Sequence, residues 1–166
     1  NTIINNQSTT AVTDFITSGD SIEFKGGTLY VKERGVSIAT GGGTVTVNSI
    51  DGDHDETVII NAGSGAVSVG RIGGTNASGE GIKSVAITSS NATGITLSGN
   101  ITTSDTADSD VTLSGNVVIS GSVDIDTSQG TDGSIEFTKT IKGAGGTDNL
   151  TLDTGNDTLT FHATNT

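Results

Sequence analysis

Pairs of apolar residues separated by a single residue recur along the chain at intervals of 18 to 26 residues. Alternation of apolar and polar positions with a period of two is typical of β-strands that bury one face. Short strands that return at a nearly fixed interval predict a β-solenoid, in which each coil buries its apolar residues against the next. We therefore predict an all-β, parallel β-helix of about seven coils with roughly 23 residues per coil. The pairs are Ile22/Phe24, Val45/Val47, Val67/Val69, Val85/Ile87, Val111/Leu113, Ile135/Phe137 and Leu159/Phe161.

The regular pairs begin just after residue 20, which suggests two parts of unequal size. Residues 1–20 are predicted to form an entry or capping segment, and residues 21–166 a single β-solenoid domain. Glycine and asparagine gather between the apolar pairs, where their tolerance of positive φ suits tight corners. Residues 44–69 also match residues 134–161 in their apolar spacing, which predicts a longer repeat of four coils laid over the coil period.

The composition is polar for a folded chain, with 31 % hydrophobic and 16 % charged residues. Such polarity often marks disorder, but here the apolar residues are gathered into strand-like runs and proline is absent. A central strand excludes proline, because proline has no backbone N–H to donate. Aromatic residues make up only 3 % of the chain, which suits the narrow aliphatic stack of a solenoid. We therefore expect a folded chain.

The charge and the cysteine content limit which partners and which cellular location the chain is expected to have. The chain has 7 Lys and Arg against 19 Asp and Glu, which gives a net charge of −12. Nucleic acid and anionic lipid are not expected as partners, because phosphate binding needs clustered basic side chains. Membrane insertion is not expected either, because no apolar run approaches about 18 residues. The absence of cysteine is compatible with export in an unfolded state, and the acidity suits an extracellular surface.

Three stretches of sequence carry a resemblance to a known class of proteins. Residues 61–75, 123–138 and 149–159 alternate Val, Ile and Leu with Ser, Thr and Asp between turns of Gly and Asn. These stretches of sequence resemble the repeats of large secreted bacterial adhesins of the filamentous-haemagglutinin-like class, and the resemblance covers roughly residues 44–166. The resemblance implies a right-handed parallel β-helix, export to the bacterial cell surface, and a partner molecule on a host or neighbouring cell. Parallel crossovers also prefer the right hand. No functional residue is carried over.

One acidic cluster could bind a metal ion. Asp51, Asp53, Asp55 and Glu56 supply carboxylate oxygens at close intervals around an interposed glycine. Ca²⁺ takes six to eight oxygen ligands on a flexible loop, so these four residues are the candidate ligands of a Ca²⁺ site. The segment is not an EF-hand, because the glycine is misplaced and no glutamate stands at the twelfth position. The alternative is a solvated acidic corner between two strands.

A second acidic pair lies near the end of the chain. Asp148 and Asp157 are nine residues apart, as are Leu150 and Leu159. This spacing is similar to the nonapeptide repeat of calcium-binding β-rolls, which makes the pair a further candidate for Ca²⁺. The alternative is ordinary alternation of turn and strand. In either case Ca²⁺ would be an optional ligand, and no cofactor is required.

The leading prediction for function is a structural and adhesive segment of a large exported cell-surface protein. The chain would act as a rigid rod or spacer, with any binding on exposed strand faces or loops. The alternative is a self-assembling extracellular filament subunit, whose copies stack head to tail through open coil edges. An enzyme that acts on polysaccharides is less expected, because the acidic residues are spread over corners and the basic residues form no constellation with them. We therefore expect no enzymatic activity.

Overall fold

The computed structural model of the chain is all-β, with parallel strands stacked as a β-solenoid of about six turns and roughly 24 residues per turn. It describes residues 2–5, 12–74, 81–104 and 108–162, and contains no helix among them. The predicted β-solenoid is thus confirmed, with a slightly longer coil and about one coil fewer than the apolar pairs suggested.

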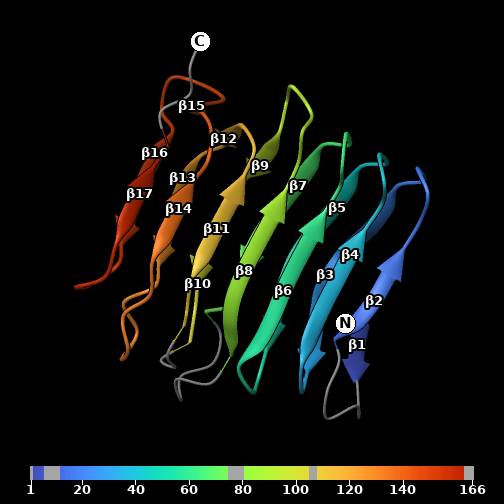
Figure 1. The fold of residues 1–166 in the computed structure, drawn as a ribbon, viewed down its shortest axis with the longest axis horizontal. Helices are drawn as coiled ribbons and strands as arrows, with labels where there is room; N and C mark the ends of the chain where they lie inside the picture. The colour runs from blue at the N-terminus through green and yellow to red at the C-terminus, as the bar shows by residue number, and fades with distance from the viewer. Residues whose placement is uncertain (1, 6–11, 75–80, 105–107, 163–166) are drawn as a thin grey trace.

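One sheet forms the front of the rod in Figure 1 and contains one strand from each successive coil. All its neighbouring strands pair in parallel. The first is β2, so the predicted entry segment supplies a strand to this sheet; residues 1 and 6–11 of that segment lie outside the described residues. The strands are β2 (Thr13–Ile16), β4 (Gly35–Ala39), β6 (Glu56–Asn61), β8 (Ile82–Thr88), β11 (Val111–Ser114), β14 (Ile135–Phe137) and β17 (Leu159–Phe161).

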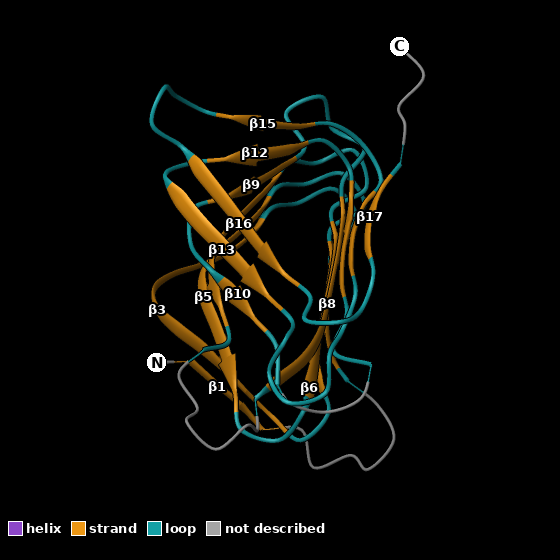
Figure 2. Cartoon of the chain, turned by 90° about the vertical axis from the view of Figure 1, so that its left-hand side faces the viewer, coloured by secondary structure: helices purple, strands orange, loops and turns teal. Residues whose placement is uncertain are grey.

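The second sheet changes shape along the rod. Its early strands are long: β1 (Thr2–Asn5) pairs with β3 (Ile22–Lys32), which pairs with β5 (Val45–Gly52). From β7 (Val67–Ile72) onward, each long strand is replaced by two short ones, because β7 pairs with both β9 and β10. Figure 2 shows the resulting third side of the coil. The short strands are β9 (Ile95–Leu97), β10 (Ile101–Thr102), β12 (Val117–Ile119), β13 (Ser122–Asp126), β15 (Ile141–Gly143) and β16 (Asn149–Asp153).

The solenoid is right-handed. In Figure 1 the strands of the front sheet point upward, the strands of the second sheet lie behind them, and successive coils advance from right to left. A chain that rises in front and returns behind while moving left follows a right-handed coil. This agrees with the predicted hand and with the preference of parallel connections.

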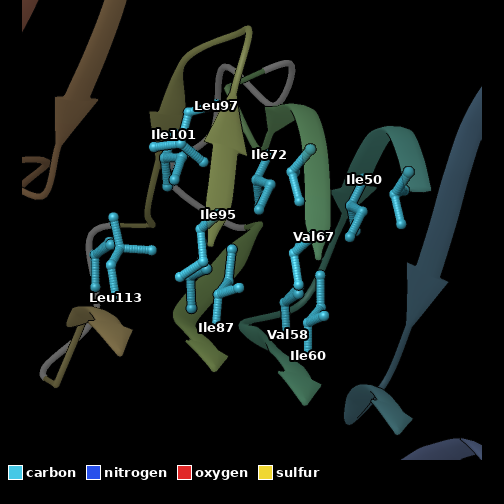
Figure 3. Close-up of a cluster of buried hydrophobic side chains, with 14 of the residues drawn as sticks. Ile50, Val58, Ile60, Val67, Ile72, Ile87, Ile95, Leu97, Ile101 and Leu113 are labelled. Carbon is cyan, nitrogen blue, oxygen red and sulfur yellow. The ribbon is translucent and has the colours of Figure 1, made fainter. Parts of the chain in front are cut away.

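The interior of the rod is an aliphatic stack built from inward-facing positions of successive strands, and Figure 3 shows part of it. In β6, for example, Val58 and Ile60 are buried, whereas Ile59 between them is exposed. Each fully buried side chain of this kind contributes about 1.5–3 kcal/mol relative to its exposed state. Ladders of Val, Ile and Leu therefore stabilise neighbouring coils against each other, and the core needs almost no aromatic residues.

The apolar pairs of the sequence belong to two different columns, which corrects their predicted phase. Val67 pairs with Ile95 in the second sheet, whereas Val85 pairs with Val58 in the front sheet. The short interval between Val67 and Val85 therefore crosses from one side of a coil to the other. The predicted four-coil repeat is wrong for the same reason, since Val45 lies in the second sheet and its proposed equivalent Ile135 in the front sheet.

Corners between strands carry buried hydroxyl groups and close backbone contacts. Thr40 Oγ1 donates a hydrogen bond to the Gly43 carbonyl at 2.5 Å, and Ser89 Oγ donates to the Gly65 carbonyl at 2.7 Å. These bonds supply hydrogen-bond donors to two carbonyl groups at the corners. Glycine is required at Gly65, because a Cβ atom there would lie 2.5 Å from the Gly43 carbonyl carbon of the preceding coil.

Apolar side chains are exposed at the two ends of the described rod. In β17, the last strand of the front sheet, Leu159 and Phe161 are 41 % and 56 % exposed, and at the other end the inward-facing Phe15 of β2 is only partly buried. Phe161 stacks on Phe137 of the preceding coil, with ring centroids 5.3 Å apart. The coils in between have a neighbour on each side, so their inward positions are covered.

Candidate acidic corner and its surroundings

The turn from β5 to β6 holds the most concentrated set of titratable side chains in the described residues. β5 ends at Gly52 and β6 begins at Glu56, so residues 53–55 form the turn. Asp55 has a positive φ of 58°, and Glu33 in the preceding coil has a φ of 74°. Gly35 pairs with Thr57, so the two left-handed residues are stacked on the same corner. Aspartate adopts this conformation more readily than most residues, which suits it to the turn.

Glu56 occupies an inward position of β6 and is fully buried. In the next coil its strand partner is Ile82, an aliphatic residue. Glu56 Oε2 accepts a hydrogen bond from the backbone N–H of His54 at 3.0 Å, whereas Glu56 Oε1 is buried without a hydrogen-bond partner. Burial raises the pKa of Glu56 above its usual value, because desolvation disfavours the carboxylate. An ionisable carboxyl group thus occupies an inward position whose strand partner in the next coil is aliphatic.

Asp53 lies between two basic groups. Its Oδ2 accepts a hydrogen bond from Lys32 Nζ at 2.9 Å, and its Oδ1 lies 2.8 Å from His54 Nδ1. The second distance fits an ion pair with a protonated imidazole, although Oδ1 accepts no bond of hydrogen-bond geometry. Burial acts to raise the pKa of Asp53, but the contacts with His54 and Lys32 outweigh it, and the pKa lies below its usual value.

Lys32 connects this corner to the preceding coil. The hydrogen bond that Lys32 donates to Asp53 raises the pKa of Lys32, because it favours the ammonium form. Lys32 Nζ also lies 5.7 Å from the ring centroid of Tyr30, within range of a cation–π contact. Burial and the nearby charges of Asp53 and Asp51 raise the pKa of Tyr30.

The four residues predicted as Ca²⁺ ligands point to different places. Asp51 Oδ2 accepts hydrogen bonds from Arg71 Nη1 and Nη2 at 3.4 and 3.3 Å. Asp55 Oδ1 accepts a hydrogen bond from Ser104 Oγ at 2.9 Å. Only Asp53 and Glu56 come together, and His54 joins them: one possible ligand atom from each lies within 4.8 Å of the others.

Three residues of this corner were missed from the sequence. His54 was not among the predicted ligands, and Lys32 and Arg71 were not assigned to any constellation. Lys32 stands 21 positions from Asp53, and Arg71 stands 20 positions from Asp51. Both separations are close to one coil, so a search for charged pairs one coil apart is the signal that could have found them.

An open cavity of about 440 Å³ adjoins the acidic corner. Its charged lining is mixed, with Arg34 and Lys83 beside Glu33 and Asp55. Lys83 Nζ lies 3.8 Å from the exposed carboxylate of Asp108, a long ion pair. The residues that line the cavity are Val12, Glu33, Arg34, His54, Asp55, Thr57 and Lys83.

The second predicted pair, Asp148 and Asp157, is split by a strand. Asp148 precedes β16 and Asp157 follows it. Asp148 Oδ1 accepts a hydrogen bond from Gly121 N at 2.6 Å, and Asp148 Oδ2 accepts one from Gly145 N. These backbone bonds, that from Gly145 above all, lower the pKa of Asp148. Asp157 Oδ1 accepts a hydrogen bond from Thr158 N at 2.6 Å within its own turn. Both side chains thus stabilise corners of the coil.

Comparisons of the chain with protein-family models, with curated proteins and with solved structures found no match. In the part of the chain that the structure describes, no helix has the length and hydropathy needed to cross a membrane.

Proposed function

We propose that this chain is a rigid structural rod within a large bacterial surface protein that is exported to the cell exterior. The observation that carries this proposal is the uninterrupted ladder of parallel strands. The front sheet alone runs through seven strands from β2 to β17, and a continuous aliphatic core lies behind it. Such a rod holds its two ends at a fixed separation, because each coil is hydrogen-bonded and packed against its neighbours.

The surroundings proposed for the rod are supported by composition and by the resemblance to secreted adhesins. A net charge of −12 and the absence of cysteine suit a protein that is exported and remains soluble outside the cell. In this role the rod presents a partner-binding region to a host or neighbouring cell, or carries a binding surface on its own outer faces. It has no catalytic role.

Surface labelling of intact cells tests the proposed location. Antibodies raised against the purified chain are applied to cells that produce the protein, with and without permeabilisation. We expect strong labelling of intact cells. Labelling that requires permeabilisation would overturn the proposal, and an antibody against a cytoplasmic protein serves as the control for leakage.

A second candidate function is a filament subunit, which the exposed apolar end of the rod favours. Leu159 and Phe161 lie on the outermost described strand of the front sheet, where a further coil would cover them. The first coil of another copy could supply that cover, since open strand edges pair readily with other strands. Head-to-tail stacking of this kind is not closed and produces a polymer.

Light scattering of the purified chain over a range of concentrations separates the two candidates. A rod that acts as a spacer stays monomeric, whereas a filament subunit grows with concentration. If growth occurs, Phe161→Asp is expected to abolish it, because the charge falls on the stacking end. Ile59→Asp is the matched control, since Ile59 is 38 % exposed on the outer face in the middle of the rod. Growth that is lost equally in both variants would reject end-to-end stacking.

A further inference from the structure

The corner between β5 and β6 brings together three side chains of a kind that binds metal ions. One ligand atom each from Asp53, His54 and Glu56 lies within 4.8 Å of the other two. The donor set is one imidazole nitrogen and two carboxylate oxygens. All three residues lie within four consecutive positions of the chain, so the turn itself sets their arrangement.

An unpartnered oxygen in this corner points to a ligand. Glu56 is fully buried, and its Oε1 accepts no hydrogen bond. A buried polar atom without a partner loses its hydration with nothing in return, and the loss is greater when the group is charged. Asp53 Oδ1 is also buried and accepts no hydrogen bond, although it lies 2.8 Å from His54 Nδ1. A cation bound among these atoms would satisfy both oxygens at once.

The other charged groups of the corner have contacts of their own that do not occupy the ligand atoms of Asp53, His54 and Glu56. Asp51 is held by Arg71, and Asp55 accepts a hydrogen bond from Ser104. Lys32 binds Asp53 through Oδ2, so Asp53 Oδ1 remains on the side of His54. A hydrogen bond to the second oxygen of a ligand carboxylate is a usual way to fix its orientation. The His54 side chain is 61 % exposed, which gives an ion access from solvent.

The chemistry of the donors selects the type of metal ion. Ca²⁺ prefers six to eight oxygen ligands and rarely uses imidazole, whereas Zn²⁺ binds mixed nitrogen and oxygen sets with four ligands. Three protein ligands with one position left for water are a common zinc arrangement. We propose that Asp53, His54 and Glu56 bind a divalent transition-metal ion, with Zn²⁺ as the best match. This site shares Asp53 and Glu56 with the Ca²⁺ site expected from the sequence, but it replaces Asp51 and Asp55 with His54 and binds a different metal.

The bound ion would connect the surface of the turn to the interior of the rod. Glu56 belongs to the inward face of β6, and Asp53 is bonded to Lys32 of the preceding coil. Metal binding therefore stabilises the junction of these two coils, and its free energy adds to that of folding. This inference goes beyond the proposed structural role and does not depend on where the protein is located.

Calorimetric titration of the full, tag-free chain with ZnCl₂ alone, after treatment with EDTA, tests the proposal. We expect one Zn²⁺ per chain and a rise of Tm on binding. His54→Ala and Glu56→Gln should each weaken binding by at least about tenfold. Asp55→Asn is the matched control, because it removes a carboxylate from the same turn but not from the site, and asparagine tolerates the same positive φ. Zn²⁺ affinity should persist in this control.

Several results would overturn the site. No Zn²⁺ binding by the wild-type chain is one, and equal affinity in wild type, His54→Ala and Glu56→Gln is another. Tighter binding of Ca²⁺ than of Zn²⁺, lost in Asp55→Asn, would reject the Zn²⁺ site and support the Ca²⁺ site expected from the sequence. Co²⁺ gives a check that does not depend on protein stability. The visible absorption band of bound Co²⁺ should appear in the wild type and be lost in His54→Ala, and circular dichroism establishes that the variant is folded.

Discussion

Glu56 lies directly beside Gly52, and the lack of a side chain at Gly52 leaves the space that the buried carboxylate occupies. A Cβ atom at Gly52 would fall 2.9 Å from Glu56 Cδ, nearer still to Glu56 Oε2, and 3.1 Å from Ile82 Cδ1. The backbone at Gly52 does not have a positive φ. The need for glycine here is therefore steric and comes mainly from Glu56.

Gly52→Ala is expected to destabilise the chain by about 1–3 kcal/mol, because it overpacks a filled interior. The cost should shrink when Glu56 is also replaced by alanine, since the shortened side chain frees the space. Urea unfolding of the two single variants and the double variant measures this coupling, which we expect to exceed about 0.5 kcal/mol. Costs that simply add would show that Glu56 is not the residue that excludes a side chain at Gly52.

A second glycine prediction concerns contact between the backbones of neighbouring coils. At Gly65, a Cβ atom would lie 2.5 Å from the Gly43 carbonyl carbon and 2.8 Å from the Gly42 carbonyl oxygen. Backbone cannot move aside as a flexible side chain can, so Gly65→Ala should cost about 3 kcal/mol or more. Gly146→Ala is the control, because no heavy atom lies within 4 Å of its Cβ position. Its unfolding free energy should stay within about 0.5 kcal/mol of wild type. Equal losses in the two variants would contradict the steric account.

The sequence predicted the fold because the alternation of apolar residues is a local property. Val45, Val47, Val58 and Ile60 all face inward as their alternation indicates. The grouping of strands into columns was not predictable in the same way. Coil length varies when corners lengthen, and from β7 onward each long strand gives way to two short ones. An assumed constant interval therefore treated Val67 and Val85 as equivalent positions, although they lie on different sides of a coil.

The candidate site was predicted in part. The clustering of acids in residues 51–56 located the corner, because a run of carboxylates between strands is visible without a structure. Which carboxylates meet was not visible, because their partners Lys32, Arg71 and Ser104 come from other coils. The alternation of β6 does place Glu56 inward together with Val58 and Ile60. If the same alternation is extended from Val58 and Ile60 back to Glu56, it predicts that the Glu56 carboxyl group is buried.

The exposed end of the rod leads to a prediction about two leucines in the front sheet. Leu113 is fully buried in β11, whereas Leu159 in β17 is 41 % exposed. Leu113→Ala should lower the unfolding free energy by about 2–5 kcal/mol, because it leaves a cavity between two covering coils. Leu159→Ala should cost less than about 1 kcal/mol, because much of that side chain is already in water. Denaturant unfolding measures both losses, and light scattering at the same protein concentration gives the particle mass of each variant. A large loss at Leu159, combined with a fall in particle mass, would instead indicate that another copy covers this end.

The corner aspartate Asp148 should make stability depend on pH in the acid range. Its carboxylate accepts hydrogen bonds from the backbone of Gly145 and Gly121, and these lower its pKa in the folded chain. The contribution of Asp148 to stability is therefore fully present above the pKa of the unfolded chain, about 3.8, and is lost as the pH falls through the pKa of the folded chain.

Asp148→Asn keeps one acceptor oxygen but cannot accept both bonds. Its Tm should lie below that of wild type at pH 7, and the difference should shrink as the pH falls below about 3.8. Because other carboxylates titrate in the same range, the informative quantity is the difference in Tm between the two proteins, followed by circular dichroism from pH 7 to pH 2. A difference that stays constant over this range would show that Asp148 stabilises the corner by packing and not through its charged hydrogen bonds.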